Sequence, residues 1–212
     1  MLPPVIPVLP TLLLASLAAA MTASAGEPKP IFDGKTLEGW EGDPKIWSVR
    51  DGEIVGGSLS KTVPRNEFIA TRRGYTNFVL RFKFRLEGTE GFVNSGMQIR
   101  SERVPNDSEM VGYQADIGEG WYGALYDESR RNKVLARPDE ATVKKAVKPG
   151  EWNEYEIRAE GSRIVLRING VQTVDYTETD PKIVQHGRLG LQIHGGGKSV
   201  IHAKDITIEE LP

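Results

Sequence analysis

Apolar and polar residues alternate one by one along many short segments of the chain. In residues 78–86, five large apolar side chains occupy every second position, and Val79 and three basic residues lie between them. Successive side chains of a β-strand point to opposite faces, so this pattern predicts a strand with one face in a core. Related patterns predict strands at 47–49, 53–55, 67–70, 97–100, 113–117, 154–159, 164–168, 171–176, 189–194 and 200–209.

Turn residues separate these segments. Asp51-Gly52 and Asn169-Gly170 each join two predicted strands, and such dipeptides favour tight hairpins because both residues accept positive φ. Only residues 139–147 have a helical pattern. Many short strands without strand–helix–strand alternation predict an all-β fold, a two-sheet antiparallel β-sandwich. We expect its core to contain Phe82, Phe84, Ile157, Leu166 and Ile168.

Three of the predicted strands carry an unusual polar face. Each has two chemically capable side chains two residues apart: Gln98 with Arg100, Gln114 with Asp116, and Gln192 with His194. The other strands expose mainly Lys, Arg and Glu, as half-buried strands do where they meet water. If the three strands share a sheet, an acid, a cation, an imidazole and three amides meet on one surface. That mixture suits a polyhydroxylated ligand such as a sugar, although each pair could also be an ordinary solvent-facing position.

The segment after the second polar strand is rich in aromatic and acidic residues. Residues 119–128 contain Trp121, Tyr122 and Tyr126 together with three acids. Aromatic rings stack on the C–H faces of sugars, so this segment predicts a loop that walls and roofs the polar surface. The alternative is that Trp121 and Leu125 only pin the loop to the core.

Composition limits the other classes of function. The 212 residues have a formal net charge of −2, so there is no basic excess to attract nucleic acid or anionic lipid. Cysteine is absent, which excludes disulfides, thiolate zinc sites and a cysteine nucleophile.

The amino terminus predicts export. Residues 1–25 contain a short apolar run followed by Ala23-Ser24-Ala25, a small-residue cleavage pattern, so they are interpreted as a signal peptide. We expect residues 26–30 to be a short linker and residues 31–212 to form a single domain in the periplasm or outside the cell. No membrane association is expected after cleavage.

Several segments together resemble the 3-keto-disaccharide hydrolase family. They are Phe-Asp-Gly-Lys-Thr-Leu-Glu-Gly-Trp at 32–40, Asn-Ser-Gly-Met-Gln-Ile-Arg at 94–100, Gly-Tyr-Gln-Ala-Asp-Ile at 112–117, Trp-Tyr-Gly-Ala-Leu-Tyr at 121–126, Trp-Asn at 152–153, Gly-Leu-Gln-Ile-His-Gly at 190–195 and Asp-Ile-Thr-Ile-Glu-Glu-Leu at 205–211. The resemblance implies a concanavalin-like jelly roll whose concave sheet carries the ligand site. It also implies cleavage of glycosides whose glucose ring has been oxidised to a ketone at carbon 3. Lys204-Asp205 departs from the more usual Arg-Asn.

A second resemblance fails in an informative way. Residues 114–119 have the spacing of the Glu-x-Asp-x-x-Glu motif of jelly-roll glucanases, but the first position is Gln114. An amide cannot form the glycosyl ester of the retaining mechanism, which requires a carboxylate nucleophile. If this protein cleaves a glycoside, it uses another route.

A ketone at carbon 3 supplies that route, because it acidifies the hydrogen on carbon 2. The reaction then needs a base, a partner for the developing oxyanion and an acid for the leaving oxygen. On the matching positions, His194 and Asp116 are candidate bases, Arg100 a candidate enolate stabiliser, and Tyr126 or Glu119 a candidate acid; Gln98, Gln114 and Gln192 would bind hydroxyls, with Trp121 and Tyr122 beside them.

Other interpretations stay open at this point. A calcium ion could be bound by oxygen ligands from Asp116, Glu119 and Asp127. No other cofactor is indicated. The main rival function is a lectin-like carbohydrate-binding module without chemistry, and a structural interaction domain is a third. Convergence of His194, Asp116 and Arg100 within ~6 Å would favour catalysis, and their dispersal would favour binding. The oligomeric state is undetermined.

Overall fold

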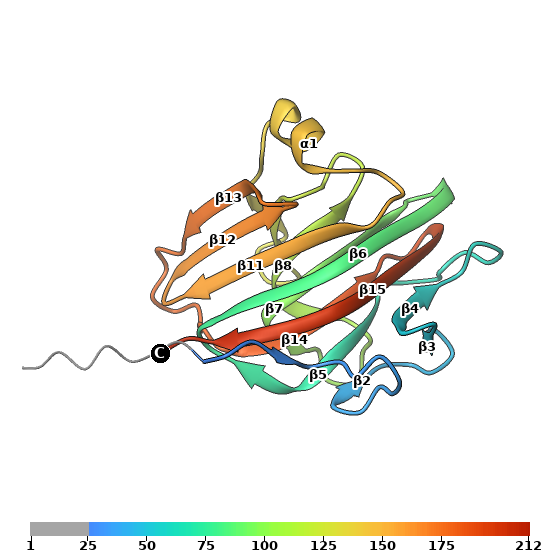
Figure 1. Ribbon diagram of the computed structural model, residues 1–212, viewed down its shortest axis with the longest axis horizontal. Coiled ribbons are helices and arrows are strands. Elements are labelled where there is room, and N and C mark those ends of the chain that lie inside the picture. Colours follow the sequence, from blue (N-terminus) through green and yellow to red (C-terminus); the bar gives the residue numbers. More distant parts are fainter. Residues whose placement is uncertain (1–25) are drawn as a thin grey trace, which may run out of the picture.

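The computed structural model describes residues 26–212, and the predicted signal peptide, 1–25, lies outside the described residues. Two antiparallel sheets face each other across the core (Figure 1). The first sheet has the strand order β13-β12-β11-β6-β15-β4-β3, with β1 also paired to β15. Its strands are β1 Lys29–Pro30, β3 Trp47–Arg50, β4 Glu53–Gly57, β6 Phe78–Gly91, β11 Asn153–Glu160, β12 Arg163–Ile168, β13 Val171–Thr177 and β15 Gly197–Glu210.

The second sheet has the order β10-β9-β8-β7-β14-β5-β2. Its strands are β2 Trp40–Glu41, β5 Glu67–Tyr75, β7 Asn94–Arg103, β8 Met110–Gly118, β9 Leu125–Glu128, β10 Lys133–Ala136 and β14 Gly187–Ile193. The single helix of residues 26–212, α1 (Glu140–Ala146), begins at Asp139, whose side chain accepts a hydrogen bond from the Thr142 N–H. The predicted all-β, two-sheet antiparallel sandwich is confirmed, and so is the helical turn.

The alternating patterns produce the core. Phe82, Phe84 and Ile157 of the first sheet are all at most 1% exposed, and the Tyr155 ring stacks on Phe82 with centroids 5.6 Å apart. From the second sheet come Met97, Ile99, Tyr113, Ala115, Leu191 and Ile193. Each fully buried large apolar side chain stabilises the fold by about 1.5–3 kcal/mol, so the two sheets depend on each other.

The segment expected to be a linker belongs to the first sheet instead. Lys29 and Pro30 pair with Ile208 and Thr207 of β15, and the Gly26 N–H donates to the Glu210 carbonyl oxygen. A short polar segment with two prolines has little strand signal, and the long β15 strand supplies the pairing partner.

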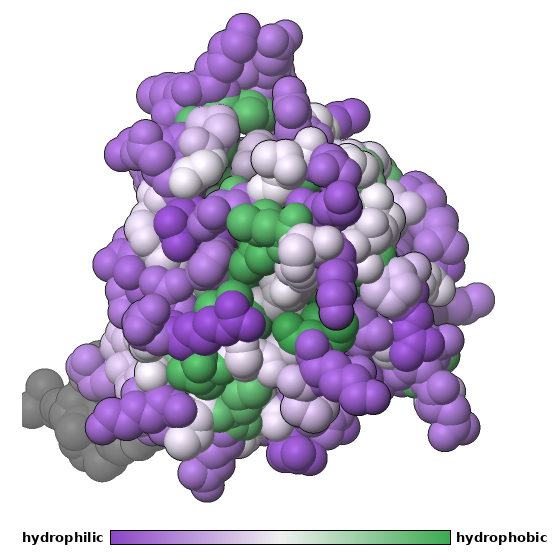
Figure 2. Space-filling model, turned by 90° about the vertical axis from the view of Figure 1, so that its right-hand side faces the viewer, coloured by the Kyte–Doolittle hydropathy of each residue, from purple (hydrophilic) through white to green (hydrophobic). Residues whose placement is uncertain are grey.

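The side of the molecule shown in Figure 2 is mainly hydrophilic. On the side shown in Figure 2, apolar residues form several small patches separated by hydrophilic ones. Among residues 26–212, no helix is sufficiently long and apolar to span a membrane.

A β-bulge in β7 changes which side chains face the core. Ile99 pairs with Tyr113 and Glu102 with Val111, so two residues, Arg100 and Ser101, lie opposite Gly112 alone. Arg100 adopts a φ of 49°, a left-handed conformation that is uncommon for a non-glycine residue. The additional residue moves Ser101 into the position that strict alternation assigns to Arg100.

The Arg100 side chain consequently links the ends of the two sheets. Its guanidinium donates to the carbonyl oxygens of Thr76 (2.7 Å) and Gly161 (2.6 Å) and to Gln185 Oε1 (2.6 Å). Gly161 lies in the turn between β11 and β12 of the first sheet. Burial lowers the pKa of Arg100 to about 10. The predicted position of Arg100 on a ligand-binding face is therefore wrong.

We expect Arg100→Ala to destabilise the fold by about 2–4 kcal/mol, because it removes a buried side chain whose partly buried hydrogen bonds join Thr76, Gly161 and Gln185. Urea unfolding measures the loss. The matched control is Arg158→Ala, which removes an exposed pair with Glu160 and should cost under ~0.5 kcal/mol. A stable Arg100→Ala protein that loses only ligand binding or activity would contradict this structural role.

Candidate functional site

The second sheet carries a polar cluster on its outer face, the face turned away from the core. Gln98, Gln114 and Asp116 alternate with core residues on β7 and β8, and Gln192 does so on β14. Gln98 lies directly opposite Gln114 in the β7–β8 pairing. The sequence placed these four side chains together, and the structure brings them into contact.

Hydrogen bonds connect the cluster in one direction. The Ser101 hydroxyl donates to Gln98 Oε1 (2.5 Å), and Gln98 Nε2 donates to Gln114 Oε1 (3.0 Å). Gln114 Nε2 then donates both to Asp116 Oδ1 (2.8 Å) and to Gln192 Oε1 (3.3 Å). We call Ser101, Gln98, Gln114, Asp116 and Gln192 the amide chain. The donors therefore run from Ser101 through Gln98 and Gln114 to Asp116 and Gln192.

A glycine makes the longest of these contacts attainable. Gln114 is on β8 and Gln192 is on β14, and β7 lies between them. Gly96 of β7 pairs with both Asp116 and Gln192, so it lies in the path of the Gln114 side chain. A Cβ atom at Gly96 would be 2.6 Å from Gln114 Cγ, which is too close for any real contact. Only glycine at this position lets the Gln114 amide cross the strand.

Two polar atoms of the cluster remain without a partner. Gln98 and Gln192 are 0% exposed, and Gln114 and Asp116 are 2% exposed. Within residues 26–212, Asp116 Oδ2 and Gln192 Nε2 are buried and have no hydrogen-bond partner. Leaving such groups unpaired costs about 1–3 kcal/mol each. One atom is an acceptor or acid and the other is a donor, and both side chains contact the same Gln114 nitrogen. A ligand hydroxyl, which both donates and accepts, matches this pair.

The cluster also shifts the titration of its acids. Burial raises the pKa of Asp116 well above its usual range, and the charge of Glu128 adds to the rise, while the Gln114 N–H and Arg137 oppose it. Burial raises the pKa of Glu128 to about 7, and the nearby Glu109 contributes in the same direction. The Gln192 amide approaches Glu128 and offsets part of that rise. Two acids whose pKa values are raised by burial therefore share the site.

Glu128 was not singled out in the sequence, although a signal was present. The segment predicted as a loop contains a strand, β9, in which Tyr126 pairs with Gln114 and Glu128 with Gly112. Tyr126 and Glu128 are two residues apart, the same spacing as in the three predicted pairs. Cross-strand pairing places both on the outer face, beside the amide chain.

The aromatic residues of the 119–128 segment have different surroundings. Trp121 contacts the Tyr126 ring edge-on with centroids 5.9 Å apart, and both side chains are half-buried. Burial and then the negative charges of Glu128 and Asp116 raise the pKa of Tyr126. Tyr122 packs against the core cluster, and Glu119 is exposed. Trp121 and Tyr126 therefore border the polar cluster, whereas Glu119 stands apart from it.

His194 lies just beyond the end of β14, two residues after Gln192. Its backbone N–H donates to the Asn94 carbonyl oxygen, and its ring contacts Phe92 edge-on with centroids 4.5 Å apart. Nδ1 is 2.7 Å from the Gly195 carbonyl oxygen. A carbonyl only accepts, so a neutral ring carries its proton on Nδ1 and leaves Nε2 as the basic nitrogen. Among the described residues, no hydrogen bond joins His194 to the amide chain.

His194, Asp116 and Arg100 do not converge, because Arg100 points to the far ends of the sheets, and of the two arrangements considered in the sequence this is the one that favours binding. The three acids considered as possible calcium ligands, Asp116, Glu119 and Asp127, lie in different surroundings. Asp127 is buried on the core side of β9, where it forms ion pairs with Arg130 and Arg131, and Glu119 is exposed. Within residues 26–212, no three His, Asp or Glu side chains are grouped as metal ligands.

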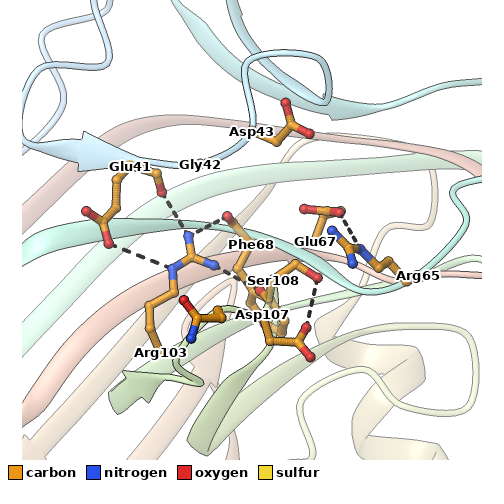
Figure 3. Close-up of a pocket in the computed structure, with 10 residues that line it drawn as sticks. Glu41, Gly42, Asp43, Arg65, Glu67, Phe68, Arg103, Asp107 and Ser108 are labelled. Carbon is orange, nitrogen blue, oxygen red and sulfur yellow. Dashed lines mark hydrogen bonds and ion pairs between the residues drawn. The ribbon is translucent and has the colours of Figure 1, made fainter.

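A pocket of about 370 Å³ lies elsewhere on the second sheet, between β2, β5 and the β7–β8 connection (Figure 3). Arg103 crosses it and donates to the carbonyl oxygens of Glu41 (3.0 Å), Phe68 (2.8 Å) and Ser108 (2.9 Å). Arg65 pairs with Glu67 at 3.0 Å. These arginines are occupied by protein partners, so the amide chain is the better candidate site.

Comparison with known proteins identifies the family. The sequence matches the 3-keto-alpha-glucoside-1,2-lyase-like domain over residues 27–209, which is most of the chain. The chain belongs to this family. The resemblance noted in the sequence is thus confirmed. No curated protein sequence matches the chain significantly.

Three solved structures similar to this family member have carbohydrate-related names. Two are Parabacteroides distasonis proteins provisionally named glycosyl hydrolases. One is 21% identical to this chain with a TM-score of 0.67, and the aligned region covers 88% of this chain and 94% of the other chain. The other is 25% identical with a TM-score of 0.64, and the aligned region covers 87% of this chain and 100% of the other chain. A third is the carbohydrate-binding module CBM66 of Bacillus subtilis, which is 16% identical with a TM-score of 0.63. The aligned region covers 81% of this chain and 96% of the module. These likenesses confirm the jelly-roll fold.

Glu128 should make stability depend on pH. Its pKa is about 7 in the folded protein and about 4.5 ordinarily, so the folded state binds the proton more tightly. The stability that the folded protein gains from this tighter proton binding is complete below about pH 4.5 and is lost as the pH rises through 7. We expect the free energy of unfolding of Glu128→Gln, relative to that of the wild type, to rise by about 1–2 kcal/mol when the pH is raised from 5 to 8, after allowing for the partial exposure of Glu128.

Urea unfolding at the two pH values measures this gain. Glu102→Gln, which changes an exposed acid of β7, should show no such gain. An equal stability difference between Glu128→Gln and the wild type at both pH values would contradict the raised pKa.

Proposed function

We propose that this protein cleaves glycosides whose glucose ring carries a ketone at carbon 3, and that the amide chain is its active site. The observation that carries the proposal is the buried pair of unpartnered atoms, Asp116 Oδ2 and Gln192 Nε2, beside an acid that titrates near neutral pH. Family membership directs this chemistry to a 3-keto-glycoside. The fold neighbours named as glycosyl hydrolases and as a carbohydrate-binding module agree with a saccharide ligand.

The reaction proceeds by elimination and hydration. A base takes the proton from carbon 2, and the electron pair of that C–H bond moves to give an enolate whose charge is on the oxygen at carbon 3. The enolate then expels the substituent at carbon 1, and the leaving oxygen takes a proton. Water adds across the resulting double bond between carbons 1 and 2, with its hydroxyl on carbon 1. No carboxylate nucleophile is required, which agrees with an amide at Gln114.

The titration of the two acids divides the roles. Glu128, with a pKa of about 7, is the favoured base, because proton transfer is most effective when the pKa of the base is near the working pH. Asp116, whose buried carboxyl group favours the neutral acid, is assigned the donor role toward the oxygen at carbon 3. It takes the role that the sequence suggested for Arg100. His194 Nε2 is the alternative base, at the end of the same face.

The remaining side chains bind the sugar. The Gln192 amide has a free N–H for a hydroxyl, and Gln98 and Gln114 keep it in place. The half-buried Trp121 and Tyr126 offer aromatic faces at the border, and the Tyr126 hydroxyl is the candidate acid for the leaving oxygen. These contacts would select a polyhydroxylated ring as the ligand without requiring a particular leaving group.

A carbohydrate-binding function without chemistry is the second candidate. One observation favours it: Arg100, the fixed positive charge expected beside the substrate, serves as a link between the sheets. A binding module would use the same amides and aromatic rings but would return every sugar unchanged. Turnover separates the two functions.

The purified protein should release product from a 3-keto-glucoside and none from the unoxidised parent glucoside. In deuterated water, deuterium should enter carbon 2 of the product, because elimination requires that proton to leave. Mass spectrometry and proton NMR detect both results. Product from the parent alone, or product without label at carbon 2, would overturn the elimination route. Binding of both sugars without turnover would support the binding module.

Substitutions should identify the base. Glu128→Gln should lower kcat by ~10²–10⁴-fold if Glu128 removes the proton. Asp116→Asn should lower kcat by roughly 10²–10³-fold, as expected for loss of an oxyanion partner. Glu102→Gln, an exposed acid of β7, is the control and should retain activity. If His194→Ala is far more damaging than Glu128→Gln, histidine is the base and the assignment to Glu128 is wrong.

A further inference from the structure

The amide chain begins at a residue that no part of the proposed chemistry uses. Ser101 is 0% exposed, and the β7 bulge turns its side chain to the outer face. Its hydroxyl oxygen lies 2.5 Å from Gln98 Oε1, 2.9 Å from the Ile99 carbonyl oxygen and 3.4 Å from the Tyr113 carbonyl oxygen. All three neighbours are acceptors. The Ser101 hydroxyl is therefore a donor in this site.

A donor at this end fixes the orientation of every amide that follows. The hydroxyl has a single proton, and Gln98 Oε1 is its nearest acceptor; with the proton on that oxygen, Gln98 Nε2 faces Gln114. Gln114 then accepts through Oε1 and turns Nε2 toward Asp116 and Gln192. A glutamine amide has a donor end and an acceptor end, so reversing one member reverses the next. The hydrogen bonds of such a chain also strengthen one another.

The reversed chain would treat Asp116 differently. It would present Gln114 Oε1 to Asp116 Oδ1, so two oxygens would meet unless the carboxyl group carried a proton between them. In the observed orientation, Gln114 supplies an N–H to that oxygen at 2.8 Å. The orientation of the amides therefore decides whether ionised Asp116 is stabilised.

We propose that Ser101 is a positioning residue, whose hydroxyl sets the direction of the three glutamine amides and so keeps an N–H donor on Asp116. The functional consequence rests on the proposed function, but the orientation itself does not. Other groups that act on Asp116 are Glu128 and Tyr126 of β9, Arg137 after β10, and Tyr155 of β11, whose hydroxyl is 3.5 Å from the Asp116 carbonyl oxygen. None of them controls the direction of the amides.

Ser101→Ala tests this proposal, with Ser95→Ala as the matched control. Ser95 is also on β7 and 0% exposed, and its hydroxyl also donates to a carbonyl oxygen, that of Gln192 at 2.6 Å, but it donates to no amide side chain. Both variants lose one buried serine hydrogen bond. Only Ser101→Ala removes the donor that orients the chain.

NMR of the full protein without substrate provides the readout. We expect Ser101→Ala to raise the apparent pKa of the Asp116 carboxyl by about one pH unit, as partial loss of a hydrogen bond to a charged group implies. The side-chain NH₂ signals of Gln98, Gln114 and Gln192 should shift and exchange faster with water. Ser95→Ala should leave the Asp116 titration unchanged, and Ser101→Thr, which keeps the hydroxyl, should restore it.

If the proposed function also holds, Ser101→Ala moves the alkaline limb of the kcat profile upward by the same amount, because Asp116 acts in its protonated form. Absence of turnover in the wild type would overturn the proposed function and leave the NMR result as the test of Ser101. If Ser101→Ala does not fold, Ser101→Cys, a weaker donor of similar size, should give a smaller shift in the same direction. If Asp116 titrates identically in the wild type and in Ser101→Ala, or in Ser101→Cys where that variant replaces it, the positioning role is overturned.

Discussion

The site depends on one amide group, that of Gln114. It accepts a hydrogen bond from Gln98 and donates to Asp116 and Gln192, so it connects three strands of the second sheet. All four side chains are buried, and a buried polar group without partners costs more free energy than one hydrogen bond returns. The strands therefore keep the register that aligns these groups. The same requirement explains the glycine at position 96, where any side chain would block the Gln114 amide.

Burial also gives the site its chemistry. Burial raises the pKa of Glu128 to about 7 and the pKa of Asp116 well above its usual range, because both carboxyl groups lose hydration. The charge of Glu109 adds to the rise at Glu128, and the charge of Glu128 adds to the rise at Asp116. The Gln114 amide moderates this effect at Asp116 by donating an N–H to Oδ1. Under the proposed function, one of these acids accepts a proton and the other donates a hydrogen bond, which elimination beside a ketone requires.

The β7 bulge separates structural from functional residues. It turns Arg100 toward the ends of the two sheets, where carbonyl oxygens bind its guanidinium, and it turns Ser101 toward the amides. A buried cation is tolerated there because all its contacts are acceptors. Without the additional residue, a guanidinium would lie beside Gln98 and a serine would lie at the sheet ends.

The sequence by itself determined the sandwich, the core and the meeting of Gln98, Gln114, Asp116 and Gln192. These follow from alternation, a local property that survives as long as each strand keeps its regular pleat. Local pattern also gave the family resemblance.

Tertiary structure alone decided the positions of Arg100, Ser101 and Glu128. A bulge depends on how two strands pair, and the β9 strand exists because β8 offers it an edge, so neither can be deduced from one segment. The direction of the amides was likewise undetermined in the sequence, because a glutamine has no preferred end until a fixed donor such as Ser101 is packed against it.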